Sequence, residues 1–212
     1  MTTVRAEAIA AAGAAARDEL ASTHEAREIT LPASRAAIRA CALSIRAVQR
    51  REFDVARTHI AEAARLVAEA DAATTEQGSV RHAGFLHDAK KEFAEANLTL
   101  AFVEGTPLPT AADLGVDAPA YLNGMAEAAS ELRRQVLDLL RAGDPGRAEE
   151  LFAVMDEVYA MLVTVDYPDA VTGGLRRTTD ALRGVLERTR GDVTNATVVA
   201  RLQAAVEQTR RA

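Results

Sequence analysis

Apolar residues recur at steps of three and four along almost the whole chain, and this is the spacing of one face of an α-helix. Between Arg81 and Val103 the stripe is formed by Phe85, Ala89, Phe93, Ala96, Leu100 and Val103. No stretch shows sustained alternation of apolar and polar residues with turn signals at hairpin spacing. The pattern therefore predicts an all-α fold, a bundle of about seven helices that spans residues 1–212 as a single helical domain.

Breaks in the stripe give the expected helix boundaries. Pro32 predicts a break or kink, with Ser34 as the cap of the helix that follows, and Asp144 with Pro145 predicts the start of another. Thr194 or Asn195 is the expected cap of a final helix. The expected helices cover residues 2–27, 34–51, 53–72, 81–103, 118–141, 145–163, from Pro168 to about 190, and 194 to the end; a short turn is expected at 111–114.

Composition narrows the function classes. The net charge of −6 disfavours a generally basic, nonspecific nucleic-acid binder, although it allows a locally basic channel. Cys41 is the single cysteine, which leaves neither a disulfide framework nor a cysteine-based zinc site. No secretion signal and no apolar run of membrane-spanning length is present, so we expect a soluble, cytoplasmic protein without a membrane partner.

Three carboxylates share the helix face opposite the apolar stripe, namely Asp88, Glu92 and Glu95. Like charges at this spacing repel by about a few tenths of a kcal/mol per pair in water, and more when they lose solvent. Open solvent, neighbouring arginines or a divalent cation could each make the arrangement tolerable. Glu92 and Glu95 have the spacing for carboxylate ligands of Mg²⁺ or Mn²⁺, although a solvated face remains the alternative.

A third acid, Asp156, falls at the edge of an apolar face beside Phe152 and Tyr159. It is either a further metal ligand or a hydrogen-bonded residue at the boundary of the core.

Cations gather next to the acids. They could contact a polyanion such as a nucleic acid, or they could only compensate the carboxylates, and the sequence leaves both open. These candidate nucleic-acid-binding residues are Arg81, His82, His87, Lys90 and Lys91. The chain contains no glycine-rich nucleotide-binding loop and no nucleophile motif.

Several motifs, in order along residues 35–192, resemble the translin family, in particular its prokaryotic members and translin-associated factor X. They are Glu92–Ala96 followed by Ala101–Val103, Tyr121–Gly124 followed by Glu131–Arg133, Arg141–Asp144, Met155–Tyr159, and Gly174–Arg177. The resemblance implies a seven-helix, all-α subunit that assembles into a closed barrel, usually an octamer, with nucleic acid bound inside. It also implies the catalytic acids of the factor X type, a Glu-x-x-Glu pair and a later Asp, which fall on Glu92, Glu95 and Asp156.

The expected function is therefore a single-stranded RNA-binding, Mg²⁺-dependent (or Mn²⁺-dependent) endoribonuclease acting inside a homo-oligomeric barrel. In this expectation Glu92, Glu95 and Asp156 are both the metal ligands and the catalytic residues. Two alternatives stay open. One is a non-catalytic translin-type oligomer that binds RNA or DNA, and the other is a structural helical bundle whose acids form a solvated face.

Overall fold

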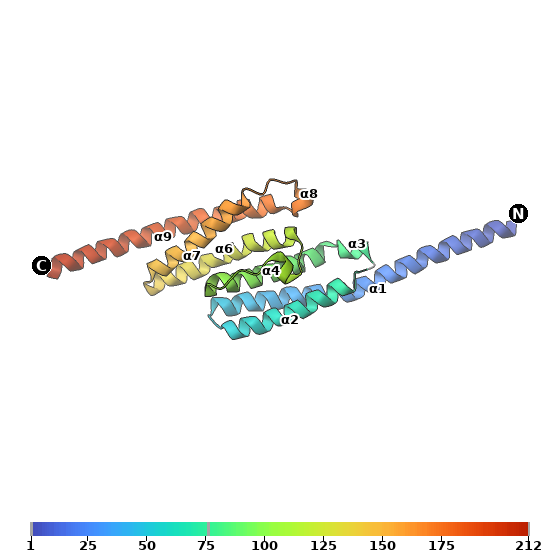
Figure 1. The fold of residues 1–212 in the computed structure, drawn as a ribbon, viewed down its shortest axis with the longest axis horizontal. Helices are drawn as coiled ribbons and strands as arrows, with labels where there is room; N and C mark the ends of the chain where they lie inside the picture. Colours follow the sequence, from blue (N-terminus) through green and yellow to red (C-terminus); the bar gives the residue numbers. More distant parts are fainter. Residues whose placement is uncertain (1, 76, 212) are drawn as a thin grey trace.

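The computed structural model describes residues 2–75 and 77–211, and within these residues the chain forms nine helices and no strand (Figure 1). The prediction of an all-α fold is confirmed. Six helices are long and three are single turns. The long helices are α1 (Thr2–Gln49), α2 (Phe53–Ala72), α4 (Gly84–Glu104), α6 (Ala118–Ala142), α7 (Pro145–Leu162) and α9 (Leu175–Arg211); the short ones are α3 (Gly78–Arg81), α5 (Ala111–Leu114) and α8 (Asp169–Thr172).

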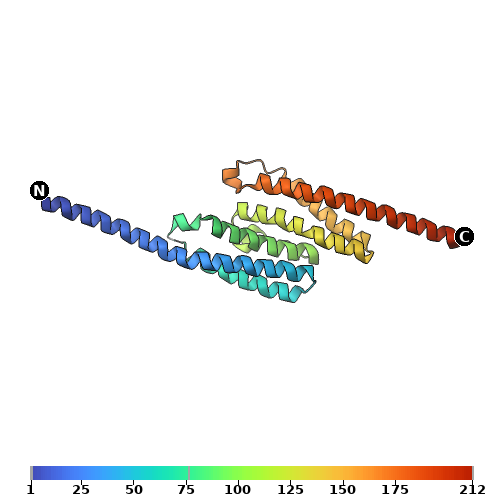
Figure 2. The ribbon, with the colours of Figure 1, turned by 180° about the vertical axis from the view of Figure 1, so that it is seen from behind.

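The helices pack as a chain of neighbours. α1 and α2 form a hairpin, α4 lies against both, α6 lies against α4, and α7 and α9 cover the far side of α6 (Figures 1 and 2). The apolar stripes meet in two cores. One, between α1, α2 and α4, includes Ala37, Leu66, Leu86 and Phe93. The other, between α4, α6, α7 and α9, includes Leu98, Leu132, Met155 and Leu182.

The two longest helices extend beyond this bundle at opposite ends. The N-terminal part of α1 and the C-terminal part of α9 project away from the other helices (Figures 1 and 2). Among the residues whose burial the structure describes, the first buried one is Ala26 on α1 and the last is Val193 on α9.

A break or a kink was predicted at Pro32; α1 runs through this proline, so the break is wrong. A proline inside a helix leaves the carbonyl one turn earlier without its backbone partner. Pro32 lies on the exposed side of α1, where water can bond that carbonyl, while Thr30 and Ala33 are buried on the other side. Packing therefore holds the helix together across the proline. Ser34, predicted as a helix cap, is buried in the middle of α1 instead.

The predicted division of the C-terminal helices is also wrong. Gly173 and Gly174 have φ angles of 61° and 83°, in the left-handed region that glycine adopts readily, and they separate α8 from α9. α9 then continues through Thr194, whose hydroxyl donates to the carbonyl of Arg190 one turn earlier instead of capping a new helix.

Other boundaries agree closely. Asp144 caps α7, with its Oδ1 accepting a hydrogen bond from the backbone N–H of Arg147 at 3.0 Å. No helix in the described residues combines the length and apolar character needed to cross a membrane.

Candidate metal centre

The candidate metal centre lies where α4 and α6 approach one another at Gly124. A Cβ atom added to this glycine would lie 2.6 Å from the carbonyl oxygen of Lys91 and 3.0 Å from the backbone nitrogen of Glu95. Any side chain at this position would therefore push the two helices apart. Glu127 lies one turn further along α6 and emerges on the same side of the helix, toward α4.

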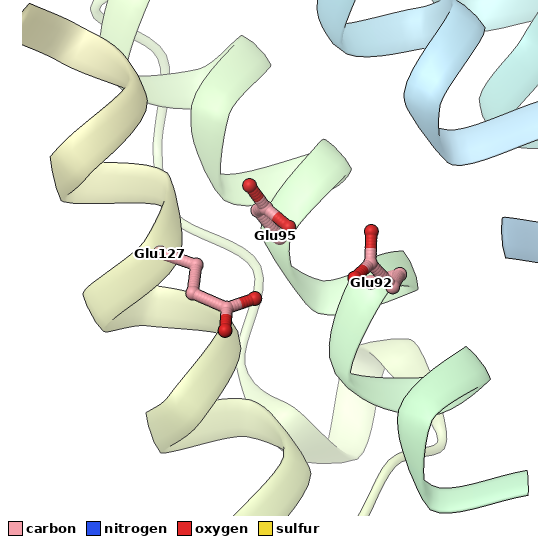
Figure 3. A group of neighbouring side chains, drawn as sticks. All are labelled: Glu92, Glu95 and Glu127. Carbon is pink, nitrogen blue, oxygen red and sulfur yellow. The ribbon is translucent and has the colours of Figure 1, made fainter. Parts of the chain in front are cut away.

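Three carboxylates meet at this contact (Figure 3). Glu92 and Glu95 come from α4, and Glu127 reaches toward them from α6. An oxygen atom from each of the three lies within 4.8 Å of the other two, which is a spacing that one metal ion can bridge. The predicted pair is thus brought together with a third acid that the sequence analysis did not single out.

Burial and mutual repulsion disfavour ionisation of these acids. Glu95 is only 7% exposed, and burial, followed by the charges of Glu92, Glu127 and Glu131, raises its pKa to about 9. The pKa of Glu92 is also raised, mainly by burial. Without a bound cation, Glu95 therefore holds a proton at neutral pH.

Among the residues that the structure describes, Lys91 supplies the one ammonium group that bonds directly to the cluster. Its Nζ donates a hydrogen bond to Oε1 of Glu127 at 2.8 Å and lies 3.6 Å from Oε1 of Glu92. Burial alone would lower the pKa of Lys91, but the hydrogen bond to Glu127 and the charges of the glutamates raise it above its ordinary value. Lys91 is thus a charged partner of Glu127 and Glu92, whereas no ion pair in the described residues includes Glu95.

α1 packs against α4, the helix that carries Glu92 and Glu95. Burial and the charges of Glu92 and Glu95 raise the pKa of the Cys41 thiol on α1 to about 12, so this thiol stays neutral. At the end of α1, Gln49 donates to Glu131 at 2.6 Å and accepts from Arg134 at 2.9 Å. This bridge fixes a fourth carboxylate, Glu131, one turn beyond Glu127 on α6.

Asp156 does not join this group, which corrects the sequence prediction of a third ligand on α7. Its carboxylate accepts a hydrogen bond from Nη2 of Arg190 on α9 at 2.9 Å, and the same guanidinium lies over the ring of Phe152. α7 packs chiefly against α6 and α9, so its acids are directed to a different part of the bundle from those of α4. Glu127, from the helix that does contact α4, is the third acid of the cluster.

Four of the five predicted nucleic-acid contacts line one cavity of about 340 Å³ at the N-terminal end of α4, together with Asp117 and Gly173. They are Arg81, His82, His87 and Lys90. The fifth, Lys91, turns instead toward the carboxylates. Lys90 is paired with Asp71 and is almost fully buried, whereas Arg81 and His82 are exposed. The two exposed cations are therefore the members best placed to meet a polyanion.

No protein-family model matches the chain. An uncharacterised protein of Methanocaldococcus jannaschii is 30% identical over 177 residues, which cover 82% of this chain and 78% of that protein. The structure of AfC3PO in complex with duplex RNA superposes with a TM-score of 0.80 at 31% identity and covers 87% of this chain and 95% of that one.

A second AfC3PO crystal structure gives a TM-score of 0.79 at the same identity, covering 87% of this chain and 96% of that one. The crystal structure of apo-NeC3PO shares 18% identity with a TM-score of 0.75, covers 85% of this chain and 94% of that one, and supports the fold alone.

Proposed function

The chain belongs to the translin family, and from this membership we infer that it is an RNA-binding protein that assembles into a closed homo-oligomer. The similarity to AfC3PO supports RNA binding, because that protein is found in complex with duplex RNA. We further propose that the subunit is a metal-dependent endoribonuclease whose centre is the carboxylate cluster of Glu92, Glu95 and Glu127. The observation that carries this proposal is the convergence of three carboxylates from two helices around one buried acid.

The donor set fits Mg²⁺ or Mn²⁺. Both are hard cations that prefer carboxylate oxygens, and both bind through a few protein ligands while keeping positions open for water and phosphate. Glu92, Glu95 and Glu127 would hold the ion, which would replace the proton of Glu95 and relieve the repulsion among the three groups. The bound cation would supply Lewis-acid polarisation of the scissile phosphate and a lowered pKa for an attacking water.

The remaining residues have positioning roles in this proposal. Lys91 would contact the phosphate that enters the cluster, since its ammonium group already lies beside two of the three carboxylates. Arg81 and His82, which lie just before the N-terminus of α4 at the end of α3, would attract the nucleic-acid backbone without reading its sequence. Gln49 and Arg134 would keep Glu131 fixed beside the centre.

A second candidate is a translin-type oligomer that binds RNA or DNA without cleaving it. The observation that favours it is again Lys91, because its ammonium group already compensates part of the acidic charge. In this alternative the cluster is a buried charge network that needs no metal.

RNA cleavage assays separate the two candidates. Purified protein is incubated with end-labelled single-stranded RNA, duplex RNA and single-stranded DNA, with Mg²⁺, Mn²⁺ or a chelator. We expect cleavage of RNA that needs the metal and is lost in Glu95→Gln and Glu127→Gln but retained in Glu157→Gln, which removes an exposed glutamate of α7.

Gel-shift binding at low salt, where phosphate contacts are strongest, is measured for every variant. Binding without cleavage under any metal would establish the second candidate. Cleavage that survives Glu95→Gln would show that the carboxylate cluster is not the centre. Light scattering tests the assembly: we expect the mass of a closed oligomer, an octamer by family resemblance, and a stable monomer would contradict it.

A further inference from the structure

The helix face that packs α1 into the bundle continues, without a change of period, into the projecting N-terminal part of the helix. Ala26, Thr30, Ala33 and Ala37 are buried on this face. Continuing the same steps of three and four toward the N-terminus leads through Ser22 to Glu19, Ala15, Ala12, Ala8 and Arg5. These six residues are all exposed in the described part of the chain.

The projecting face is built like a helix–helix contact surface. Alanines at this spacing let two helix backbones approach closely. Val4, Ile9 and Leu20, which flank the alanines, are 70%, 66% and 69% exposed. Apolar side chains left in water along a helix that has the period of a packed seam call for a partner helix.

The charges on this face identify that partner. Arg5 lies seven residues before Ala12, and Glu19 lies seven residues after it. In an antiparallel pair of identical helices that cross at Ala12, Arg5 of each copy opposes Glu19 of the other. The alanines in the middle of the segment then face the alanines of the other copy, with Ala12 against Ala12 and Ala8 against Ala16. A parallel pair in register would instead set Arg5 against Arg5 and Glu19 against Glu19.

We propose that residues 4–22 of α1 form an antiparallel helix pair with the same segment of a second copy of this chain, through the face of Arg5, Ala8, Ala12, Ala15 and Glu19. A contact in which the same surface serves both partners has twofold symmetry and is closed after two chains. The segment lies outside the core and projects away from α4 and α6 (Figure 1), the helices that carry the carboxylate centre. The proposal is therefore independent of whether the protein cleaves RNA.

Cysteine cross-linking of the full-length protein tests the contact. Ala12→Cys places one thiol on each side of the twofold axis, and mild oxidation should convert most of the protein to a disulfide-linked dimer. Ala10→Cys, on the opposite face of the same exposed helix, is the matched control and should react several-fold less. Cys41 is fully buried and adds no background.

The direction of the pair is tested by mixing Arg5→Cys with Glu19→Cys protein. The antiparallel arrangement predicts disulfides between the two variants and few within either one. Disulfides within each variant would establish a parallel pair and overturn the proposal, as would equal reaction of Ala10→Cys and Ala12→Cys or no reaction of either.

Charge reversal tests the ion pairs separately. In the Ala12→Cys background, Arg5→Glu should reduce cross-linking several-fold, and the double change Arg5→Glu with Glu19→Arg should restore it. Failure of the double change to restore cross-linking would contradict the assigned register. Circular dichroism of each variant checks that the helices are intact.

Discussion

Replacement of Glu95 by glutamine is predicted to stabilise the metal-free protein, and to do so more strongly as the pH rises. The folded state raises the pKa of Glu95 from 4.5 to about 9, so between these values the folded chain keeps a proton that the unfolded chain loses. Stability from this group is therefore lost as the pH rises from 4.5 toward 9. Glutamine is neutral in both states and has nearly the same shape as the protonated side chain, so it avoids this loss.

The expected gain in the free energy of unfolding follows from the difference between the pH and the pKa of Glu95 in the unfolded chain. Each pH unit above 4.5 is worth about 1.4 kcal/mol, so Glu95→Gln should gain about 3 kcal/mol at pH 7 and less than about 1 kcal/mol at pH 5. Urea unfolding with a chelator present, at one protein concentration and several pH values, measures the difference. A fixed concentration is needed because assembly alters apparent stability.

Glu157→Gln is the control, because it removes the same formal charge from an exposed position. A gain shared by both variants would reflect net charge and not the burial of Glu95. The same gain for Glu95→Gln at pH 5 and pH 8, or a loss of stability at both, would refute the reasoning that places a protonated carboxyl in the cluster.

Three further outcomes follow from the structure. Mg²⁺ or Mn²⁺ should raise the melting temperature of the wild type but not of Glu95→Gln. The affinity for the ion, measured by calorimetry, should rise about tenfold per pH unit between pH 6 and pH 8, since the ion displaces one proton. Gly124→Ala should cost about 1–3 kcal/mol in urea unfolding because its Cβ collides with the backbone of α4, whereas Gly191→Ala, in an open part of α9, should gain about 0.5–1 kcal/mol. Asp156→Asn should leave RNA cleavage unchanged and cost less than about 1 kcal/mol, because its pair with Arg190 is half exposed.

The helical fold was predictable because its cause is local. A period of three and four specifies a helix and its buried face, and side chains such as Asp144 specify where a helix begins. The errors at Pro32 and Thr194 have different causes. At Pro32 the local signal for a break is overridden by packing of the buried residues on either side, which a single sequence does not display. At Thr194 the hydroxyl bonds to the carbonyl of Arg190 one turn earlier, so the residue that could cap a new helix continues α9 instead.

The candidate site was predictable only in the part that lies on one helix. Glu92 and Glu95 share a face of α4 whatever packs against it, so their spacing alone brings them together. The third acid depends on which helix becomes the neighbour of α4, and periodicity does not contain that information. The sequence does hold a signal that could have indicated α6, namely Gly124: a glycine inside a helix can mark a close backbone approach, and Glu127 follows it by one turn.

The structure also narrows the three ways in which crowded carboxylates can be tolerated. Open solvent does not protect Glu95, which is 7% exposed, so a solvated acidic face does not describe this cluster. Lys91 compensates Glu127 and Glu92 but makes no ion pair with Glu95. The charge of the buried acid can then be neutralised only by a proton or by a divalent cation. Protonation makes the folded state less stable at neutral pH than a neutral side chain would, because the unfolded chain releases the proton. Glutamine would fill the same space at lower cost, so the stability of the bundle does not explain the glutamate, and the proposed cation site gives it a role.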